Sequence, residues 1–230
     1  MGYHTGAMLP SSTVENYLKA IFHAETGLEP GHELVPMGQI ASALGVVPGT
    51  ATTMMKTLAD SGLVLYEPYV GVRLTAAGQK LAAMVLRRHR LVELFLVQVM
   101  GMSWAEVHDD AERLEHAVSE RLIDRIDEML GRPSVDPHGD PIPNADGVIE
   151  PHEHCALLHC PLDRPLVITR ILDQNPEFLR FVEQHGLKPG QRVEVRARDA
   201  HADSVEVVSE DGGPTTLGAR AASKLLAEPL

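Results

Sequence analysis

The 230-residue chain has few cysteines, few aromatic residues and no long apolar run. Two cysteines, Cys155 and Cys160, are too few for a disulfide framework, so we expect a reducing compartment and predict a cytoplasmic protein. No apolar stretch reaches the length that spans a bilayer, and Met1–His4 lacks the start of a signal peptide. The sequence therefore predicts a protein with no membrane partner.

Positive charge is also scarce. The chain has 20 Lys and Arg residues against 32 Asp and Glu residues, a formal net charge of -12. Indiscriminate binding to nucleic acid needs clustered positive charge, so this class of function is disfavoured. Specific DNA binding by a suitable local surface is not excluded, because acidic groups that hold divalent cations lose much of their charge.

Residues 1–75 predict a winged helix-turn-helix. After an N-terminal helix with an apolar stripe, a second short helix is expected over 36–44 and a third begins at Pro48. Only residues 45–47 separate the second helix from the third, which is the tight turn that this motif requires. Two short apolar stretches around a turn follow at 63–74 and have the pattern of a wing.

The third helix and the wing carry side chains suited to base edges and phosphates. The candidate DNA contacts are Thr50, Thr52, Thr53, Lys56, Tyr69 and Arg73. Residues 1–75 nevertheless hold more acidic than basic side chains, so one subunit is expected to bind DNA weakly. We therefore predict a homodimer that binds double-stranded operator DNA through two such domains.

Histidine and carboxylate side chains recur at helical spacing between 88 and 116. His89 and Glu93 are i, i+4 neighbours, and a second stripe on the following helix borders its apolar face. The members of that second stripe are His108, Glu112, Glu115 and His116. Imidazoles and carboxylates without thiolate suit Mn, Fe, Co or Zn, and six such residues exceed the needs of one tetrahedral site. The pattern predicts two divalent-metal sites per subunit.

Three other interpretations of this pattern stay open at this point. The stripe fits a solvated helix face, because Arg113 and Arg121 are available to pair with its carboxylates. It also fits a metalloenzyme or metal-storage module, although carboxylate-bridged bundles use paired Glu-x-x-His motifs and only Glu115-His116 is present. The third is a winged-helix regulator of some other ligand.

The C-terminal part reads as a small SH3-like β-barrel. β-branched alternation predicts strands over 166–171, 192–196 and 204–208, with helices over 176–185 and 219–226. Before it, His and Cys residues gather without the spacing of a zinc finger, so a metal site and a redox role both stay open. This group consists of His152, His154, Cys155, His159 and Cys160.

These motifs together resemble the iron- and manganese-dependent repressors of the diphtheria toxin repressor and manganese transport regulator type. The segments that carry the resemblance are 12–18, 70–75, 88–91, 107–116 and Asp136–Pro143. The resemblance implies an α+β fold with three domains joined by a linker at 144–164. They are a winged helix-turn-helix over 1–75, a helical dimerisation and metal-binding domain over 76–143, and an SH3-like domain over 165–230.

The resemblance also implies a function, namely repression of genes for manganese or iron homeostasis, with metal stabilising the DNA-competent dimer. By its motif positions, an ancillary metal site would contain His89, Glu93 and His108. A regulatory site would contain Glu112, Glu115, His116 and, from the N-terminal helix, Asn16. The C-terminal domain of the family lends a carboxylate and an amide to the ancillary site, for which Gln174 and Glu177 are the candidates.

The chain departs from the family pattern at three positions. Glu112 stands where the iron-responsive branch has a cysteine, and oxygen in place of sulfur favours Mn(II). Asn16 stands where the family supplies a Met or Asp side chain, so this ligand would be uncharged. Lys19 occupies a position where some manganese-type members carry a second carboxylate, which argues against their binuclear arrangement. The expected cofactor is Mn(II) or Fe(II).

Overall fold

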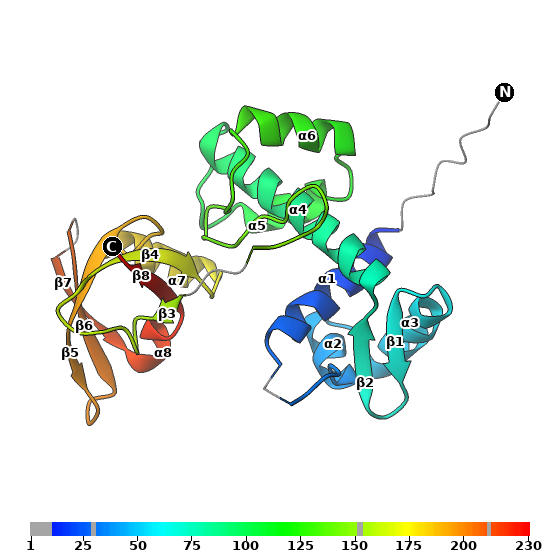
Figure 1. Cartoon of the computed structure of the whole chain (residues 1–230), viewed down its shortest axis with the longest axis horizontal. Coiled ribbons are helices and arrows are strands. Elements are labelled where there is room, and N and C mark those ends of the chain that lie inside the picture. Colours follow the sequence, from blue (N-terminus) through cyan, green and yellow to red (C-terminus); the bar gives the residue numbers. More distant parts are fainter. Residues whose placement is uncertain (1–10, 29–30, 151–153, 211–212) are drawn as a thin grey trace. The chain divides into compact units, whose positions relative to one another are not determined.

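The computed structural model describes residues 11–28, 31–150, 154–210 and 213–230 (Figure 1). The chain forms two compact units. The first unit comprises Met1–Arg87 with Pro143–Val148, and the second comprises Arg88–Ile142 with Ile149–Leu230.

The first unit is the predicted winged helix-turn-helix. Its elements are α1 (Ser12–Thr26), α2 (Met37–Ala43), α3 (Pro48–Asp60), β1 (Val64–Glu67) and β2 (Gly71–Leu74). The two strands pair antiparallel and form the wing. Apolar side chains of all three helices and of both strands form one core, as the helical and alternating patterns predict.

Local sequence explains where these helices begin and turn. The Ser11 side chain accepts the Val14 amide and caps α1, and Pro48 supplies the fixed backbone angle at the start of α3. Between α2 and α3 the chain turns at Gly45, whose φ of 63° is costly for other residues. These signals place α3 beside the wing, which is the arrangement of a DNA-reading head.

The helical part of the second unit contains the predicted ligand residues. Helix α4 (Ala76–Gln98) continues into this unit from the first, and α5 (His108–Leu114) and α6 (Glu120–Met129) follow. The expected helix through His116 ends earlier, because Glu115 is the C-cap of α5. Glu115 still has right-handed helical angles, so its side chain keeps the direction that helical spacing predicts.

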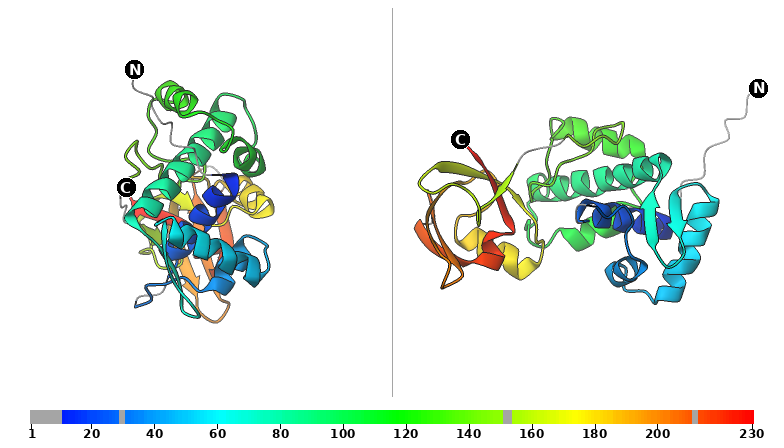
Figure 2. Two further views of the ribbon diagram at one scale, coloured as in Figure 1. Left: turned by 90° about the vertical axis from the view of Figure 1, so that its right-hand side faces the viewer. Right: turned by 60° about the horizontal axis from the view of Figure 1, so that its bottom comes forward.

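The C-terminal part of the second unit has the expected SH3-like character. Its elements are β3 (Cys155–Ala156), β4 (Pro165–Ile171), α7 (Pro176–Gln184), β5 (Arg192–Asp199), β6 (Ser204–Ser209), β7 (Gly213–Gly218), α8 (Ala219–Ala222) and β8 (Leu225–Pro229). The antiparallel strands lie in the order β3-β8-β4-β5-β6-β7 and curl around an apolar core (Figure 2). The sheet is open instead of a closed barrel, with β3 and β7 at its edges.

The last element corrects a prediction. We expected a helix over 219–226, but α8 stops at Ala222 and Leu225–Pro229 forms β8 between β3 and β4. Leu225 and Ala227 are buried while Leu226 and Glu228 are less so, which is the alternation of a strand. Hydrogen bonds to two neighbouring strands override the helix propensity of an Ala- and Leu-rich segment.

Among the described residues, no helix combines the length and the apolar character needed to cross a membrane.

Candidate metal centre

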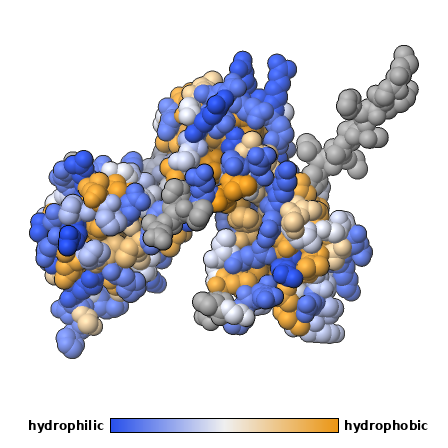
Figure 3. Space-filling view, in the orientation of Figure 1, coloured by the Kyte–Doolittle hydropathy of each residue, from blue (hydrophilic) through white to orange (hydrophobic). Residues whose placement is uncertain are grey.

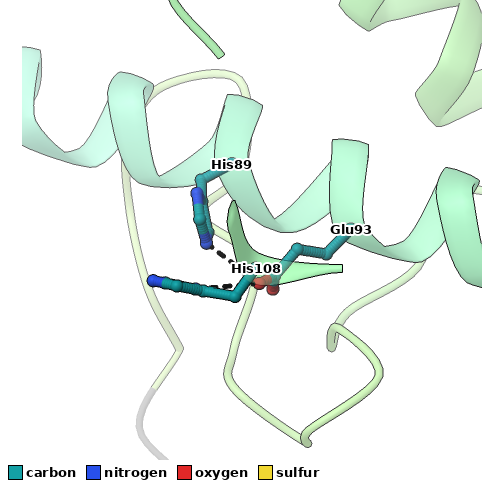
Figure 4. A group of neighbouring side chains, drawn as sticks. All are labelled: His89, Glu93 and His108. Atoms are coloured by element: carbon teal, nitrogen blue, oxygen red, sulfur yellow. Dashed lines mark hydrogen bonds and ion pairs between the residues drawn. The ribbon is translucent and has the colours of Figure 1, made fainter. Parts of the chain in front are cut away.

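Helices α4 and α5 bring three predicted ligand residues together. The Nε2 atom of His89 lies 3.0 Å from Oε1 of Glu93, one helical turn further along α4. His108, the first residue of α5, places its Nδ1 atom 3.3 Å from the same oxygen. Figure 4 shows the two imidazoles converging on the carboxylate, and one ligand atom of each lies within 4.8 Å of the others.

The second ring nitrogen of His89 contacts another group of predicted ligands. Its Nδ1 atom lies 2.6 Å from Oε2 of Glu115 and 3.9 Å from Oε1 of Glu112. These three side chains also form a group that could hold an ion. Nε2 of His116 lies 3.4 Å from Oε1 of Glu115, beside the group. His89 therefore belongs to both of the clusters that the sequence predicted as separate.

A third cluster contains two residues that the sequence analysis did not assign as ligands. Asp136 and His138 lie with Glu93 in a group whose three members are 4%, 0% and 0% exposed, respectively. In the sequence these two residues are ligand-type side chains within the segment Asp136–Pro143, but nothing in their spacing relates them to α4. Their burial, which is unusual for such residues, becomes evident only from the fold.

Three atoms of this third cluster are buried without a hydrogen-bond partner: Oε2 of Glu93, Oδ2 of Asp136 and Nδ1 of His138. The His138 nitrogen lies 3.7 Å from Glu93 Oε2 and 3.9 Å from Asp136 Oδ1. Unpaired buried polar atoms are costly, and a cation that accepts all three lone pairs would remove the cost. The oxygen and nitrogen donors fit Mn(II), Fe(II) or Zn(II).

The charges in this cluster depend strongly on one another. Burial opposes ionisation of Glu93, but the imidazoles of His108, His138 and His89 hold its pKa well below the ordinary value. Burial, with the charges of Asp140 and Glu93, raises the pKa of Asp136 to about 7. Imidazoles are thus the main positively charged neighbours of the carboxylates in this cluster.

Hydrogen bonds orient the third cluster for a ligand on one side. Oδ1 of Asp136 accepts the amides of His138 at 2.8 Å and Asp140 at 2.9 Å, which leaves Oδ2 available. Nε2 of His138 lies 2.8 Å from the carbonyl oxygen of Trp104. A carbonyl only accepts, so Nε2 carries a hydrogen and Nδ1 is the nitrogen that a metal would bind. Burial opposes the charged imidazolium, but hydrogen bonding to Glu93 and the charge of Asp136 raise the pKa of His138 overall, so a metal at Nδ1 would displace a proton.

The other predicted ligands lie elsewhere. Gln174 donates through Nε2 to Oδ2 of Asp140 at 2.8 Å, and Glu177 is exposed at the start of α7 with its amide bonded to Asn175. Among the described residues, Glu177 belongs to no group of His, Cys, Asp and Glu side chains that could hold an ion. Asn16 lies on α1 of the first unit and is partly buried.

The candidate DNA contacts lie on α3 and the wing. Thr50, Thr53, Lys56, Tyr69 and Arg73 are exposed, and Thr52 is partly buried. The hydroxyls of Thr52 and Thr53 donate to backbone oxygens one turn earlier, at 2.9 Å and 3.0 Å. Tyr69 sits at the turn of the wing in a left-handed conformation, with φ of 68°. These six side chains therefore remain the candidates for contact with DNA.

The described members of the His and Cys group lie at the start of the C-terminal part and make separate contacts. Nδ1 of His154 lies 2.9 Å from the Thr169 hydroxyl, and Sγ of Cys160 donates to the Cys155 carbonyl at 3.3 Å. Over the residues that the structure describes, no set of three ligand side chains forms here. His152 lies outside the described residues.

A winged helix-turn-helix and buried clusters of imidazoles and carboxylates in one chain define a metal-responsive DNA-binding regulator. Family models cover most of the sequence. Residues 9–72 match the iron dependent repressor N-terminal DNA binding domain, and residues 75–144 match the metal binding and dimerisation domain of the same family. Residues 155–229 match the FeoA domain. The chain belongs to the iron-dependent repressor family, whose members are transcriptional repressors and not enzymes.

Relatives in sequence support this assignment. The chain is 31% identical to the diphtheria toxin repressor of Corynebacterium jeikeium over 90% of its own length and 94% of that protein. It is 36% identical to the iron-dependent repressor IdeR of Mycobacterium tuberculosis over 60% of this chain and 57% of IdeR.

Solved structures also support assignment to the repressor family. A manganese-dependent transcriptional repressor in complex with manganese is 39% identical, with a TM-score of 0.83 over 94% of this chain and 100% of that one. ScaR with bound Zn2+ is 30% identical, with a TM-score of 0.76 over 96% of this chain and 100% of that one. The fold, the metal-binding class and the dimerisation domain are thus shared with repressors.

Proposed function

We propose that this protein is a cytoplasmic, manganese-dependent repressor that binds its operator as a homodimer. The observation that carries the proposal is the set of three buried polar atoms of Glu93, Asp136 and His138 without hydrogen-bond partners. Their donors are oxygen and nitrogen, and Glu112 adds a further carboxylate where the iron-responsive branch has a thiolate. Hard oxygen donors favour Mn(II), with Fe(II) as the second candidate.

Two ions per chain fit the clusters best. The group of His89, Glu93 and His108 shares His89 with one neighbour and Glu93 with the other, so three ions would require both of these side chains to bind two ions each. We assign one ion to Glu112, Glu115 and His116 with His89, and Asn16 as a further candidate. The other is assigned to Glu93, His108, Asp136 and His138. Bound metal would supply positive charge to carboxylates that otherwise repel one another.

Repression follows if metal binds the DNA-competent dimer more tightly than the alternatives, because ligands shift populations by differential affinity. The side chains proposed to contact operator DNA are Thr50, Thr52, Thr53, Lys56, Tyr69 and Arg73. The functional boundaries at 1–75, 76–143 and 165–230, with a linker at 144–164, remain part of this proposal.

A Mn(II) titration of chelator-treated protein, followed by loss of the free-ion EPR signal, tests the proposal. We expect two ions per chain, and one fewer in the Glu115→Ala, His116→Ala variant. Glu128→Ala is the matched control, because this exposed carboxylate on α6 pairs only with Arg125 among the contacts found. Absence of Mn(II) binding by the native chain would end the manganese assignment, and the same titration would be repeated with anaerobic Fe(II).

Operator binding is tested by selecting duplexes from a random DNA pool with Mn(II) and then with chelator. We expect enrichment of a palindromic sequence only in the presence of metal, because each half-site binds one subunit. Enrichment that is equal with chelator would make the protein a metal-independent regulator.

A further inference from the structure

The loop that carries Asp136 and His138 is fastened to two different parts of the second unit. On one side, the Arg90 guanidinium of α4 donates to the Pro141 carbonyl and lies 3.9 Å from Oδ2 of Asp136. On the other side, the amide of Ile171 in β4 donates to the His138 carbonyl at 2.8 Å. The C-terminal sheet therefore holds the backbone of a residue whose side chain belongs to the third cluster.

Asp140 is the side-chain counterpart of this backbone attachment. Its carboxylate forms an ion pair with Arg170 of β4 and accepts the Gln174 side-chain amide at 2.8 Å. The Asp140 amide donates in turn to Oδ1 of Asp136. A chain of direct contacts thus runs from Arg170 and Gln174, through Asp140, to a carboxylate of the cluster.

The approach of the loop to β4 is close enough to require a glycine. Gly139 has φ of 85°, and a Cβ atom at this position would lie 1.9 Å from the Thr169 carbonyl oxygen. No side chain fits there without moving the loop or the strand. The loop conformation and its contact with β4 are therefore a single structural feature.

Trp104 adds an independent link between the cluster and the C-terminal part. Its carbonyl accepts from His138, its ring centroid lies 5.5 Å from that of His138, and Nζ of Lys188 lies over the ring at 5.0 Å from its centroid. The Trp104 side chain is buried in the same core as the C-terminal sheet. The histidine is consequently positioned by a segment that packs into that sheet.

We infer that Arg170, Gln174 and Asp140 form a clasp through which the C-terminal domain sets the metal affinity of the Glu93, Asp136 and His138 cluster. In this arrangement the domain acts as a positioning element and donates no ligand atom of its own from Gln174. Partners that orient metal ligands are worth about 10- to 100-fold in metal affinity. The inference rests on the proposed function, because it assumes that this cluster binds a divalent ion.

Tryptophan fluorescence reports on metal binding at the third cluster separately from the other proposed site. Trp104 is the chain's single tryptophan, and its ring lies against His138. Mn(II) is titrated into the full-length protein while quenching of tryptophan fluorescence is recorded. We expect Arg170→Met to raise the quenching midpoint by about tenfold or more. Arg196→Met, which removes an ion pair of β5 with Glu194 and Asp163, is the matched control and should leave the midpoint unchanged.

Gln174→Glu decides between positioning and direct ligation. A carboxylate at 174 would repel Asp140 and weaken binding if Gln174 belongs to the clasp, whereas it would strengthen Mn(II) binding if Gln174 were itself a ligand. Stronger binding in this variant would overturn the inference. Should Arg170→Met fail to fold, Arg170→Lys keeps the charge without the planar fork and is expected to show a smaller loss of affinity in the same direction.

The clasp and the proposed function fail in different ways. If EPR detects two Mn(II) ions while Trp104 fluorescence is unquenched, or Arg170→Met leaves the midpoint unchanged, the clasp is wrong and the manganese assignment stands. If EPR detects no Mn(II), the proposed function itself fails.

Discussion

At the scale of single residues, the two cysteines are close in sequence but differ in environment. Cys155 is partly exposed in the short strand β3, and Cys160 is fully buried in the C-terminal core. Burial, with a further contribution from the neighbouring Cys155 thiol, raises the pKa of Cys160 to about 12. Since the thiolate is the reactive form, Cys160 stays almost entirely protonated and unreactive at neutral pH.

We therefore predict that a disulfide reagent such as DTNB modifies one thiol per native chain quickly at pH 8. The second thiol should react only after unfolding, and raising the pH to 9 should not release it because its pKa lies higher still. Absorbance of the released thiolate measures both phases. Cys155→Ser should remove the fast phase, and two fast thiols in the native chain would contradict the prediction.

The third cluster shows what the sequence could not predict at this scale. His89 and Glu93 were predictable together because one helical turn separates them on α4. Asp136 and His138 reach Glu93 only through the fold of an irregular loop, and no period relates a loop to a helix. The sharing of His89 between two carboxylate groups is likewise a matter of packing between α4 and α5.

At the scale of elements, the wing is attached to α1 by a partly buried hydrogen bond. Oε1 of Glu25, near the end of α1, accepts the Leu74 amide of β2 at 2.6 Å. Burial raises the pKa of Glu25, while this bond and the charge of Arg73 oppose the change. The Glu25 carboxylate therefore holds β2 in place, although burial makes its ionised form less favourable.

Glu25→Ala should leave the Leu74 amide without its partner and loosen β2. A lost hydrogen bond of this kind is worth about 1–2 kcal/mol, so hydrogen exchange of peptides covering β2 should accelerate by roughly 5- to 30-fold. Glu33→Ala, at an exposed site in the same unit, is the control. Unchanged exchange in Glu25→Ala would mean that the strand is held by its pairing alone.

The pH dependence of this contact has a defined sign. Folding raises the pKa of Glu25, so between the unfolded and the folded pKa the folded unit still binds a proton that the unfolded chain has lost. At higher pH the charged carboxylate lowers the free energy of unfolding. Relative to Glu25→Gln, the native chain should therefore lose stability as pH rises through the interval above 4.5. Thermal melts of both proteins between pH 4 and pH 7 measure this difference.

Element boundaries were predictable where a local signal exists. Ser11, Pro48 and Gly45 mark helix starts and a turn by their own chemistry, and the structure confirms the helices that they delimit. The segment 219–226 has no such signal, since its strand forms only by pairing with β3 and β4. The end of α5 before Glu115 was equally hidden, because Glu115 and His116 continue the helical pattern.

At the scale of the whole molecule, we expect a second copy to bind at apolar side chains that are exposed on the helical part. Leu122 and Met129 are 51% and 65% exposed on α6, two turns apart and therefore on one face. Figure 3 shows hydrophobic surface among hydrophilic residues in this part. Both residues lie within 75–144, the range matched by the metal binding and dimerisation domain.

The double variant Leu122→Glu, Met129→Glu places two charges at the proposed interface. It should raise the dissociation constant of the dimer by at least about tenfold, which corresponds to about 1.4 kcal/mol. Operator affinity should fall in parallel, because half-sites bind weakly alone. Sedimentation equilibrium of the variant and of Glu128→Gln, a neighbouring exposed position, measures the effect. An unchanged dissociation constant would mean that the dimer interface lies on another face of the helical part.

The position of β8 has a consequence for how the protein is made. This strand lies between β3 and β4, yet it is translated after every other strand of the sheet. Until Leu225–Pro229 leaves the ribosome, β4 has an unpaired side and β3 has no neighbour at all. The winged-helix unit is able to fold during synthesis, whereas the C-terminal sheet must wait for release of its last strand. A nascent chain therefore acquires its DNA-reading head before the sheet that holds the Asp136–Asp140 loop.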